Sequence, residues 1–120
     1  MGEMKLTLAQ LNPTIGDIQG NLAKIEKTLS ECRKDSPDLI IFPELFLVGY
    51  PPRDLLERSS FIARTQRAIG QLLKVSENFA QAGIIVGAPQ PNRQPIGKGI
   101  HNSALLIYKG ELLYTHHKSL

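Results

Sequence analysis

Two ionisable side chains, Glu44 and Lys118, each come directly after a predicted apolar strand. A carboxylate can accept and return a proton, and an ammonium group can stabilise a developing negative charge. The strand over 38–42 precedes Glu44, and the strand over 111–117 precedes Lys118. If both strands belong to one sheet and run in the same direction, the two charges emerge at the edge where open α/β sheets place their sites. From spacing alone, two solvated loop charges are the simpler interpretation.

Cys32, the single cysteine, falls on an apolar stripe and not beside these charges. Its predicted helix begins after the capping residue Asp17 and carries Leu22, Ile25 and Leu29 at spacings of three and four residues. Free cysteine is among the most buried residue types. We therefore interpret Cys32 as a packing residue and not as a nucleophile.

Neither the three histidines nor the run Gly97-Lys98-Gly99 predicts a further site. His116 and His117 are neighbours on a predicted strand, so their side chains point to opposite faces and cannot bind one ion together. His101 is remote in sequence and has no predicted partner, and no spacing typical of zinc ligands is present. The run Gly97-Lys98-Gly99 lacks the rest of a phosphate-binding loop, which favours a flexible turn.

The elements that must position these residues are predicted in the order β-α-β-α-β-β-β, which is typical of an α/β fold. Asp54 and Glu57 have the spacing of a capping box at the second helix, which we expect to break near residues 59–60. Strand 83–87 should run parallel to strand 38–42, because a helix connects them. The predicted elements are strands 5–10, 38–42, 83–87, 100–108 and 111–117, helices 17–34 and 55–81, a loop over 89–99 and a hairpin turn at 109–110.

The composition is that of a globular domain, because 42% of the 120 residues are hydrophobic and 21% are charged. The net charge of +3 comes from scattered Lys and Arg residues without interleaved aromatics, which argues against nucleic-acid binding. No apolar run is long enough for a membrane span, no signal peptide is evident, and one cysteine suits the cytoplasm. With no helix after the last predicted strand, we expect residues 1–120 to be the N-terminal portion of a larger domain.

The sequence around Glu44, Phe42-Pro43-Glu44-Leu45, resembles the catalytic-glutamate segment of the nitrilase superfamily. Its continuation through Gly49-Tyr50-Pro51-Pro52 and Asp54-Leu55-Leu56 resembles one branch, the glutaminase domains of glutamine-dependent NAD synthetases. Further segments resemble that branch in the right order and extend the resemblance over nearly the whole chain: Ala9-Gln10-Leu11-Asn12-Pro13, Gly16-Asp17, Asn21, Asn102-Ser103-Ala104, Gly110 and His117-Lys118-Ser119-Leu120.

This resemblance implies a nitrilase-like α-β-β-α sandwich, of which the chain holds the N-terminal half, and a Cys-Glu-Lys amidase. Glu44 matches the general base and acid that takes the thiol proton and then protonates the departing ammonia. Lys118 matches the ammonium that stabilises the tetrahedral oxyanion. The family's nucleophilic cysteine lies beyond position 120, so residues 1–120 alone are expected to be inactive. For Tyr50 and Asp54, packing and helix capping are at least as good an explanation as a place in the pocket.

The resemblance further implies that the full-length protein amidates deamido-NAD to NAD with ATP, using ammonia from glutamine. ATP and Mg would bind a synthetase domain outside this sequence, and the protein would form homo-oligomers. Two alternatives stay open: a stand-alone carbon-nitrogen hydrolase (amidase) of the same superfamily, and a non-catalytic binding module on the same scaffold. We predict only small-molecule substrates, no nucleic-acid or membrane partner, and no metal site in these residues.

Overall fold

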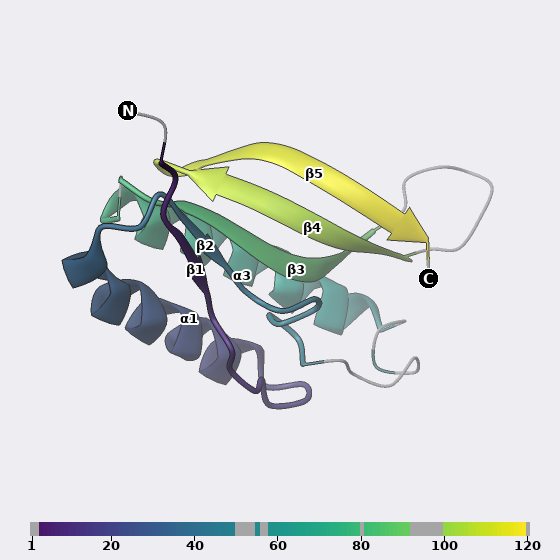
Figure 1. Ribbon diagram of the computed structural model, residues 1–120. Coiled ribbons are helices and arrows are strands. Elements are labelled where there is room, and N and C mark those ends of the chain that lie inside the picture. The colour runs from purple at the N-terminus through teal and green to yellow at the C-terminus, as the bar shows by residue number, and fades with distance from the viewer. Residues whose placement is uncertain (1–2, 50–54, 56–57, 80, 92–99, 120) are drawn as a thin grey trace.

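Five strands form a single sheet whose spatial order follows the sequence, β1-β2-β3-β4-β5 (Figure 1). The computed structural model describes residues 3–49, 55, 58–79, 81–91 and 100–119. Strands β1 (Leu6–Leu8), β2 (Leu39–Ile41) and β3 (Gly83–Pro91) are parallel to one another. Strands β4 (Ile100–Tyr108) and β5 (Glu111–Ser119) continue the sheet in antiparallel fashion. The predicted α/β fold class and the predicted strand directions are therefore confirmed.

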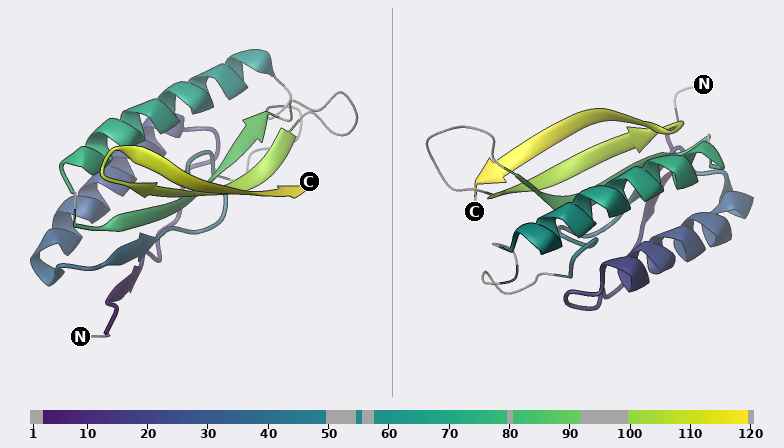
Figure 2. Two further views of the ribbon diagram at one scale, coloured as in Figure 1. Left: turned by 90° about the horizontal axis from the view of Figure 1, so that it is seen from above. Right: turned by 180° about the vertical axis from the view of Figure 1, so that it is seen from behind.

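Both long helices, α1 (Ile18–Cys32) and α3 (Ser59–Glu77), cover the same face of this sheet (Figure 2). Right-handed crossovers that advance the sheet in one direction, from β1 to β3, place their helices on one side. Helix α3 packs against β3, β4 and α1. None of the helices described is long and apolar enough to cross a bilayer. The core lies between helices and sheet and includes the fully buried Ile25, Leu29, Ile40, Phe46, Phe61, Leu72, Ile84, Leu105 and Ile107.

Helix α1 begins where the sequence predicts. The Asp17 carboxylate accepts a hydrogen bond of 3.0 Å from the Gly20 amide and so caps the first turn. The last predicted turn is instead a short 3₁₀ helix, Arg33–Asp35. Ser36, with a φ of 48°, stops it in the left-handed conformation just before β2.

The second predicted helix, over 55–81, is interrupted as expected, and the interruption lies at Arg58. The backbone of Arg58 is extended, so α3 begins at Ser59. The helix also ends earlier than predicted, at Glu77, because a turn follows in which the Ala82 amide bonds to the Phe79 carbonyl. The predicted capping box of Asp54 and Glu57 lies outside the described residues.

Strand β3 is four residues longer than predicted, because Pro89 and Pro91 belong to it and not to a loop. Beyond Ile85, β3 no longer pairs with β2, so one of its edges is free of ladder hydrogen bonds. The Gly87 carbonyl points to that free edge, where it accepts from the Leu47 amide. Residues 89 and 91 share the orientation of residue 87, so the missing proline N–H groups face the free edge and cost no pairing with β4.

The hairpin of β4 and β5 turns at Lys109 and Gly110, as predicted. Both residues have positive φ angles, 50° and 81°, which is the geometry of a two-residue type I′ turn. The hydroxyl of Ser76 accepts a hydrogen bond of 2.8 Å from the Gly110 amide and so ties the turn to α3. The hairpin is thereby fixed to the helical layer, and its far end carries Lys118.

The sheet face opposite the helices carries exposed apolar side chains. Leu6, Leu8 and Tyr114 are 52%, 63% and 62% exposed. Leu6 and Leu8 alternate with Thr7 as the sequence predicts, but the leucines lie on the open face. The two helices therefore leave this face of the sheet uncovered.

Candidate active site

A cleft of about 560 Å³ lies on the open face of the sheet, beside the carboxyl end of β2. Glu44, Asn102, His116 and Lys118 are among the polar residues that line it. Open α/β sheets place their sites at this edge because the loops that follow parallel strands meet there. The cleft therefore brings together the two residues singled out in the sequence, Glu44 and Lys118, with two polar residues that were not.

Glu44 projects from a tight turn directly after β2. The Phe46 amide bonds to the Pro43 carbonyl at 3.2 Å, and the Gly49 amide bonds to the Leu45 carbonyl at 2.9 Å. Leu45 is buried and has a φ of 53°, an uncommon conformation for leucine. Such strain persists only where surrounding contacts impose it, and it concentrates at functional sites.

Asn21 anchors this turn to the rest of the fold. Its side chain is fully buried, and its Nδ2 donates to the Leu47 carbonyl at 3.2 Å and to the Thr14 carbonyl at 2.8 Å. Its Oδ1 accepts from the Thr14 amide at 2.7 Å. One amide side chain therefore joins helix α1, the loop before it and the turn that carries Glu44. A buried polar group with all these bonds rigidifies its surroundings.

Lys118 faces Glu44 across the cleft, with 4.0 Å between Nζ and Oε1. The predicted meeting of these residues at one sheet edge is confirmed. The two side chains are 69% and 53% exposed, so the ion pair itself adds little to stability. A carboxylate held near an ammonium in an accessible cleft can instead move a proton and stabilise a developing negative charge.

Asn102 was not assigned a role from the sequence, yet its side-chain Nδ2 donates a hydrogen bond to Glu44 Oε1. Asn102 is 6% exposed and lies directly opposite Lys118 in the pairing of β4 with β5. One signal could have identified it: Asn102 is a polar residue on a largely apolar strand, and its side chain lies on the same face of the sheet as that of Lys118. Using that signal requires the register of the hairpin, which the sequence leaves open.

The prediction that His101 has no partner is wrong. Hairpin pairing places His101 beside His117, with ring centroids 4.8 Å apart, and His117 Nδ1 lies 2.7 Å from the Ser103 hydroxyl. His116 lies on the opposite face and lines the cleft, as strand alternation predicts. No group of three His, Cys, Asp or Glu side chains that could hold a metal occurs among the residues described.

Cys32 lies far from the cleft along the fold, at the end of α1 that leads into the amino end of β2. It is partly buried and packs against the core. Burial raises the pKa of the Cys32 thiol, and the nearby carboxylates of Asp35 and Glu31 raise it further. A raised thiol pKa lowers the thiolate fraction, so the structure supports a packing role.

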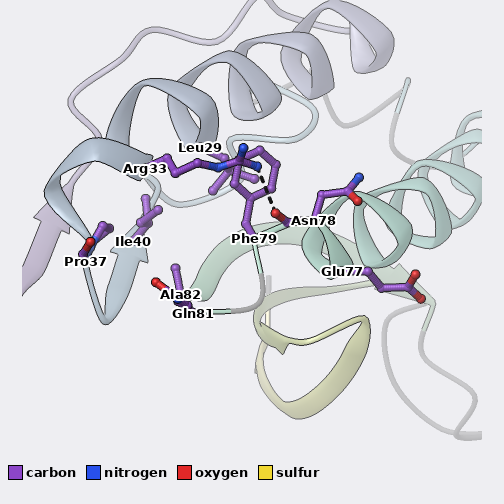
Figure 3. A pocket seen from close by; sticks show the side chains of 10 residues that line it. Leu29, Arg33, Pro37, Ile40, Glu77, Asn78, Phe79, Gln81 and Ala82 are labelled. Carbon is purple, nitrogen blue, oxygen red and sulfur yellow. Dashed lines mark hydrogen bonds between the residues drawn. The ribbon is translucent and has the colours of Figure 1, made fainter.

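Another cavity, of about 370 Å³, lies between the C-terminal ends of α1 and α3 (Figure 3). The Arg33 guanidinium stacks 4.5 Å from the centre of the Phe79 ring and donates to the Asn78 carbonyl at 2.9 Å. Glu77 points away from Arg33 in Figure 3. The cavity therefore lacks the facing acid and base of the cleft at Glu44.

The chain is similar to known proteins over nearly its whole length. Residues 5–120 match the carbon-nitrogen hydrolase family. Over 118 residues the chain is 35% identical to the glutamine-dependent NAD(+) synthetase of Thermotoga maritima, covering 98% of this chain and 19% of that protein. It is 39% identical over 119 residues to the corresponding synthetase of Synechocystis, covering 96% of this chain and 21% of that protein. The chain thus spans about a fifth of the length of these curated relatives.

Solved structures of synthetases and amidases also resemble this chain. The glutamine-dependent NAD+ synthetase of Acinetobacter baumannii matches with a TM-score of 0.77 and 29% identity over 96% of this chain and 20% of that one. A variant of the Nesterenkonia AN1 amidase, from the nitrilase superfamily, matches with a TM-score of 0.81 over 96% of this chain and 42% of that one. Its identity of 24% supports the fold alone. The predicted nitrilase-like fold is confirmed.

Proposed function

Because this chain belongs to the carbon-nitrogen hydrolase family, we propose that it supplies the base and the ammonium of a site that hydrolyses the side-chain amide of glutamine. The observation that carries this proposal is the cleft in which Lys118 Nζ lies 4.0 Å from Glu44 Oε1. The similarity to NAD synthetases named for their use of glutamine selects glutamine among amide substrates.

The proposed reaction needs a thiol in addition to these two residues. Glu44 takes the proton of the thiol, and the thiolate attacks the amide carbon to form a tetrahedral oxyanion. The Lys118 ammonium stabilises that negative charge. Glu44 then gives its proton to the departing nitrogen, and ammonia leaves as a thioester forms. Water, deprotonated by Glu44, hydrolyses the thioester to glutamate and restores the thiol.

We assign the thiol to a cysteine outside these 120 residues, because Cys32 lies at the end of α1 near the amino end of β2, away from the cleft, and its thiol has a raised pKa. Residues 1–120 alone are accordingly expected to be inactive. A base and an oxyanion stabiliser have nothing to activate without a nucleophile.

For the full-length protein we propose glutamine-dependent NAD synthesis, in which ATP drives amidation of deamido-NAD by the released ammonia. We propose that ATP and Mg bind a synthetase domain outside this sequence, since the chain is similar to NAD synthetases and spans about a fifth of their length. We further propose a homo-oligomer in the cytoplasm, a reducing compartment that suits the single cysteine seen here.

Nitrogen transfer in the full-length protein tests this function. Glutamine labelled with ¹⁵N in its side-chain amide is supplied with deamido-NAD and ATP, and the product is analysed by mass spectrometry. We expect the label in the carboxamide of NAD. Release of labelled ammonia without NAD would favour a stand-alone amidase instead. The absence of any glutamine hydrolysis would favour the binding module.

A further inference from the structure

The environment of the Glu44 carboxylate distinguishes its two oxygens. Asn102 Nδ2 donates a hydrogen bond to Oε1, and Lys118 Nζ lies 4.0 Å from the same Oε1. An ionised carboxylate only accepts hydrogen bonds, so the Asn102 amide must present its NH₂ group to Glu44. The hydrogen bond from Asn102 and the ion pair with Lys118 therefore both involve Oε1, and neither involves Oε2.

The backbone fixes this arrangement. Asn102 and Lys118 stand directly opposite each other on β4 and β5, so their side chains share the open face of the sheet. Asn102 is 6% exposed, whereas the Glu44 side chain is 53% exposed. The amide is thus held by the strand, and the more exposed partner of the bond is the carboxylate on its turn.

From this geometry we infer that Asn102 is a positioning residue, which holds Glu44 Oε1 toward Lys118 and leaves Oε2 as the oxygen that exchanges protons with the nucleophile. The inference rests on the proposed amidase function. A proton-transfer group must reach its partner at about 2.6–3.2 Å, so a carboxylate free to rotate spends less time in the productive geometry. Loss of the amide should therefore slow the chemical step more than it weakens glutamine binding.

The test compares Asn102→Ala and Asn102→Asp in the full-length protein. We expect Asn102→Ala to lower the glutaminase kcat on the order of 100-fold, the loss that a misplaced catalytic group can cause, while KM for glutamine changes little. Synthesis from added ammonia should be retained in both variants. Ser76→Ala is the matched control, because the buried Ser76 on α3 also bears a partly buried hydrogen bond but contacts the hairpin at its turn, far from Glu44.

The pH dependence of the aspartate variant distinguishes a positioning role of Asn102 from a merely structural one. The new carboxyl is nearly isosteric with the amide but donates to Glu44 only when protonated, and two facing carboxylates resist ionising together. The other ionisable groups at the cleft, Lys118 and His116, are unchanged. We therefore expect the activity of Asn102→Asp, relative to the parent protein, to rise at least tenfold as the pH falls from 8 to 5.5. The activity of Asn102→Ala relative to the parent protein should not change with pH.

Two outcomes would overturn the inference. One is a kcat for Asn102→Ala within about twofold of that of the parent protein, which would show that the hydrogen bond has no role in catalysis. The other is an Asn102→Asp profile parallel to that of the alanine variant. If the alanine variant does not fold, the isosteric aspartate variant decides alone. Glu44→Gln is assayed alongside: full activity there would refute the proposed function itself, whereas its inactivation with normal Asn102 variants would refute only the inference about Asn102.

Discussion

The backbone of Glu44 lies against Gly87 of β3, with no room for a side chain at residue 87. A Cβ atom there would stand 3.2 Å from Glu44 Cα and 3.1 Å from its carbonyl carbon, and it would collide with the Leu45 amide nitrogen. Glycine is required at such a close approach of two backbone segments. The position of the Glu44 carboxylate thus depends on the absence of a side chain at residue 87 in a neighbouring strand.

Replacing Gly87 should therefore affect both stability and activity. We expect Gly87→Ala to lower the free energy of unfolding by about 1–3 kcal/mol, because the buried turn must move to relieve the clash. Glutamine-dependent turnover should fall while ammonia-dependent synthesis persists. Gly70→Ala is the control, since an added Cβ at this exposed position of α3 meets nothing within 4 Å. That change should raise helix stability by up to about 1 kcal/mol. Equal effects of the two substitutions in denaturant titrations would contradict the packing argument.

Glu44→Gln keeps the shape of the side chain and removes its ability to carry a proton. We expect glutamine-dependent NAD synthesis in the full-length protein to fall by about 10²–10⁴-fold, the usual contribution of general acid–base catalysis. Synthesis from added ammonia should survive, because it bypasses the amide hydrolysis. Parallel assays with the two nitrogen donors check this. Unchanged glutamine turnover would remove Glu44 from the mechanism.

Lys118→Ala removes the charge that faces Glu44. The loss of one oxyanion-stabilising donor typically lowers kcat by about 10²–10³-fold, and we expect an effect of that size on glutamine hydrolysis. Because the ion pair is largely exposed, the melting temperature should barely change. Steady-state kinetics and a thermal melt of the same preparation measure both effects. Normal kinetics would show that Lys118 is only a solvated surface charge.

Cys32→Ala tests the assignment of the single cysteine to packing. We expect a loss of about 1 kcal/mol in stability, with glutaminase activity intact. The raised pKa of the Cys32 thiol also predicts slow alkylation by iodoacetamide in the native protein at pH 8, because less thiolate is present. Alkylation of the Cys32 peptide, followed by mass spectrometry, should accelerate on unfolding in urea. Loss of thioester formation in the variant would instead identify Cys32 as the nucleophile.

Local sequence predicted the order of the elements and the two main candidate site residues, Glu44 and Lys118. The Asp17 cap, the alternation of Leu6 and Leu8, and the turn at Lys109 and Gly110 each depend on neighbouring residues, so they could be predicted and were found. The relative direction of the strands then follows from the connections between them. A helix between two strands makes them parallel, and a tight turn makes them antiparallel. This was sufficient to bring Glu44 and Lys118 to one edge.

Tertiary structure alone decided which other residues reach that edge. Asn102 lies 58 residues from Glu44 in sequence, and a hairpin register shifted by one residue would turn its side chain to the other face. The contact of His101 with His117 depends on the same register. The role of Gly87 depends on how closely the turn after β2 approaches β3, a distance set by packing over the whole core. Sequence thus predicted the charged groups, whereas strand register and backbone packing determined the residues that hold them in place.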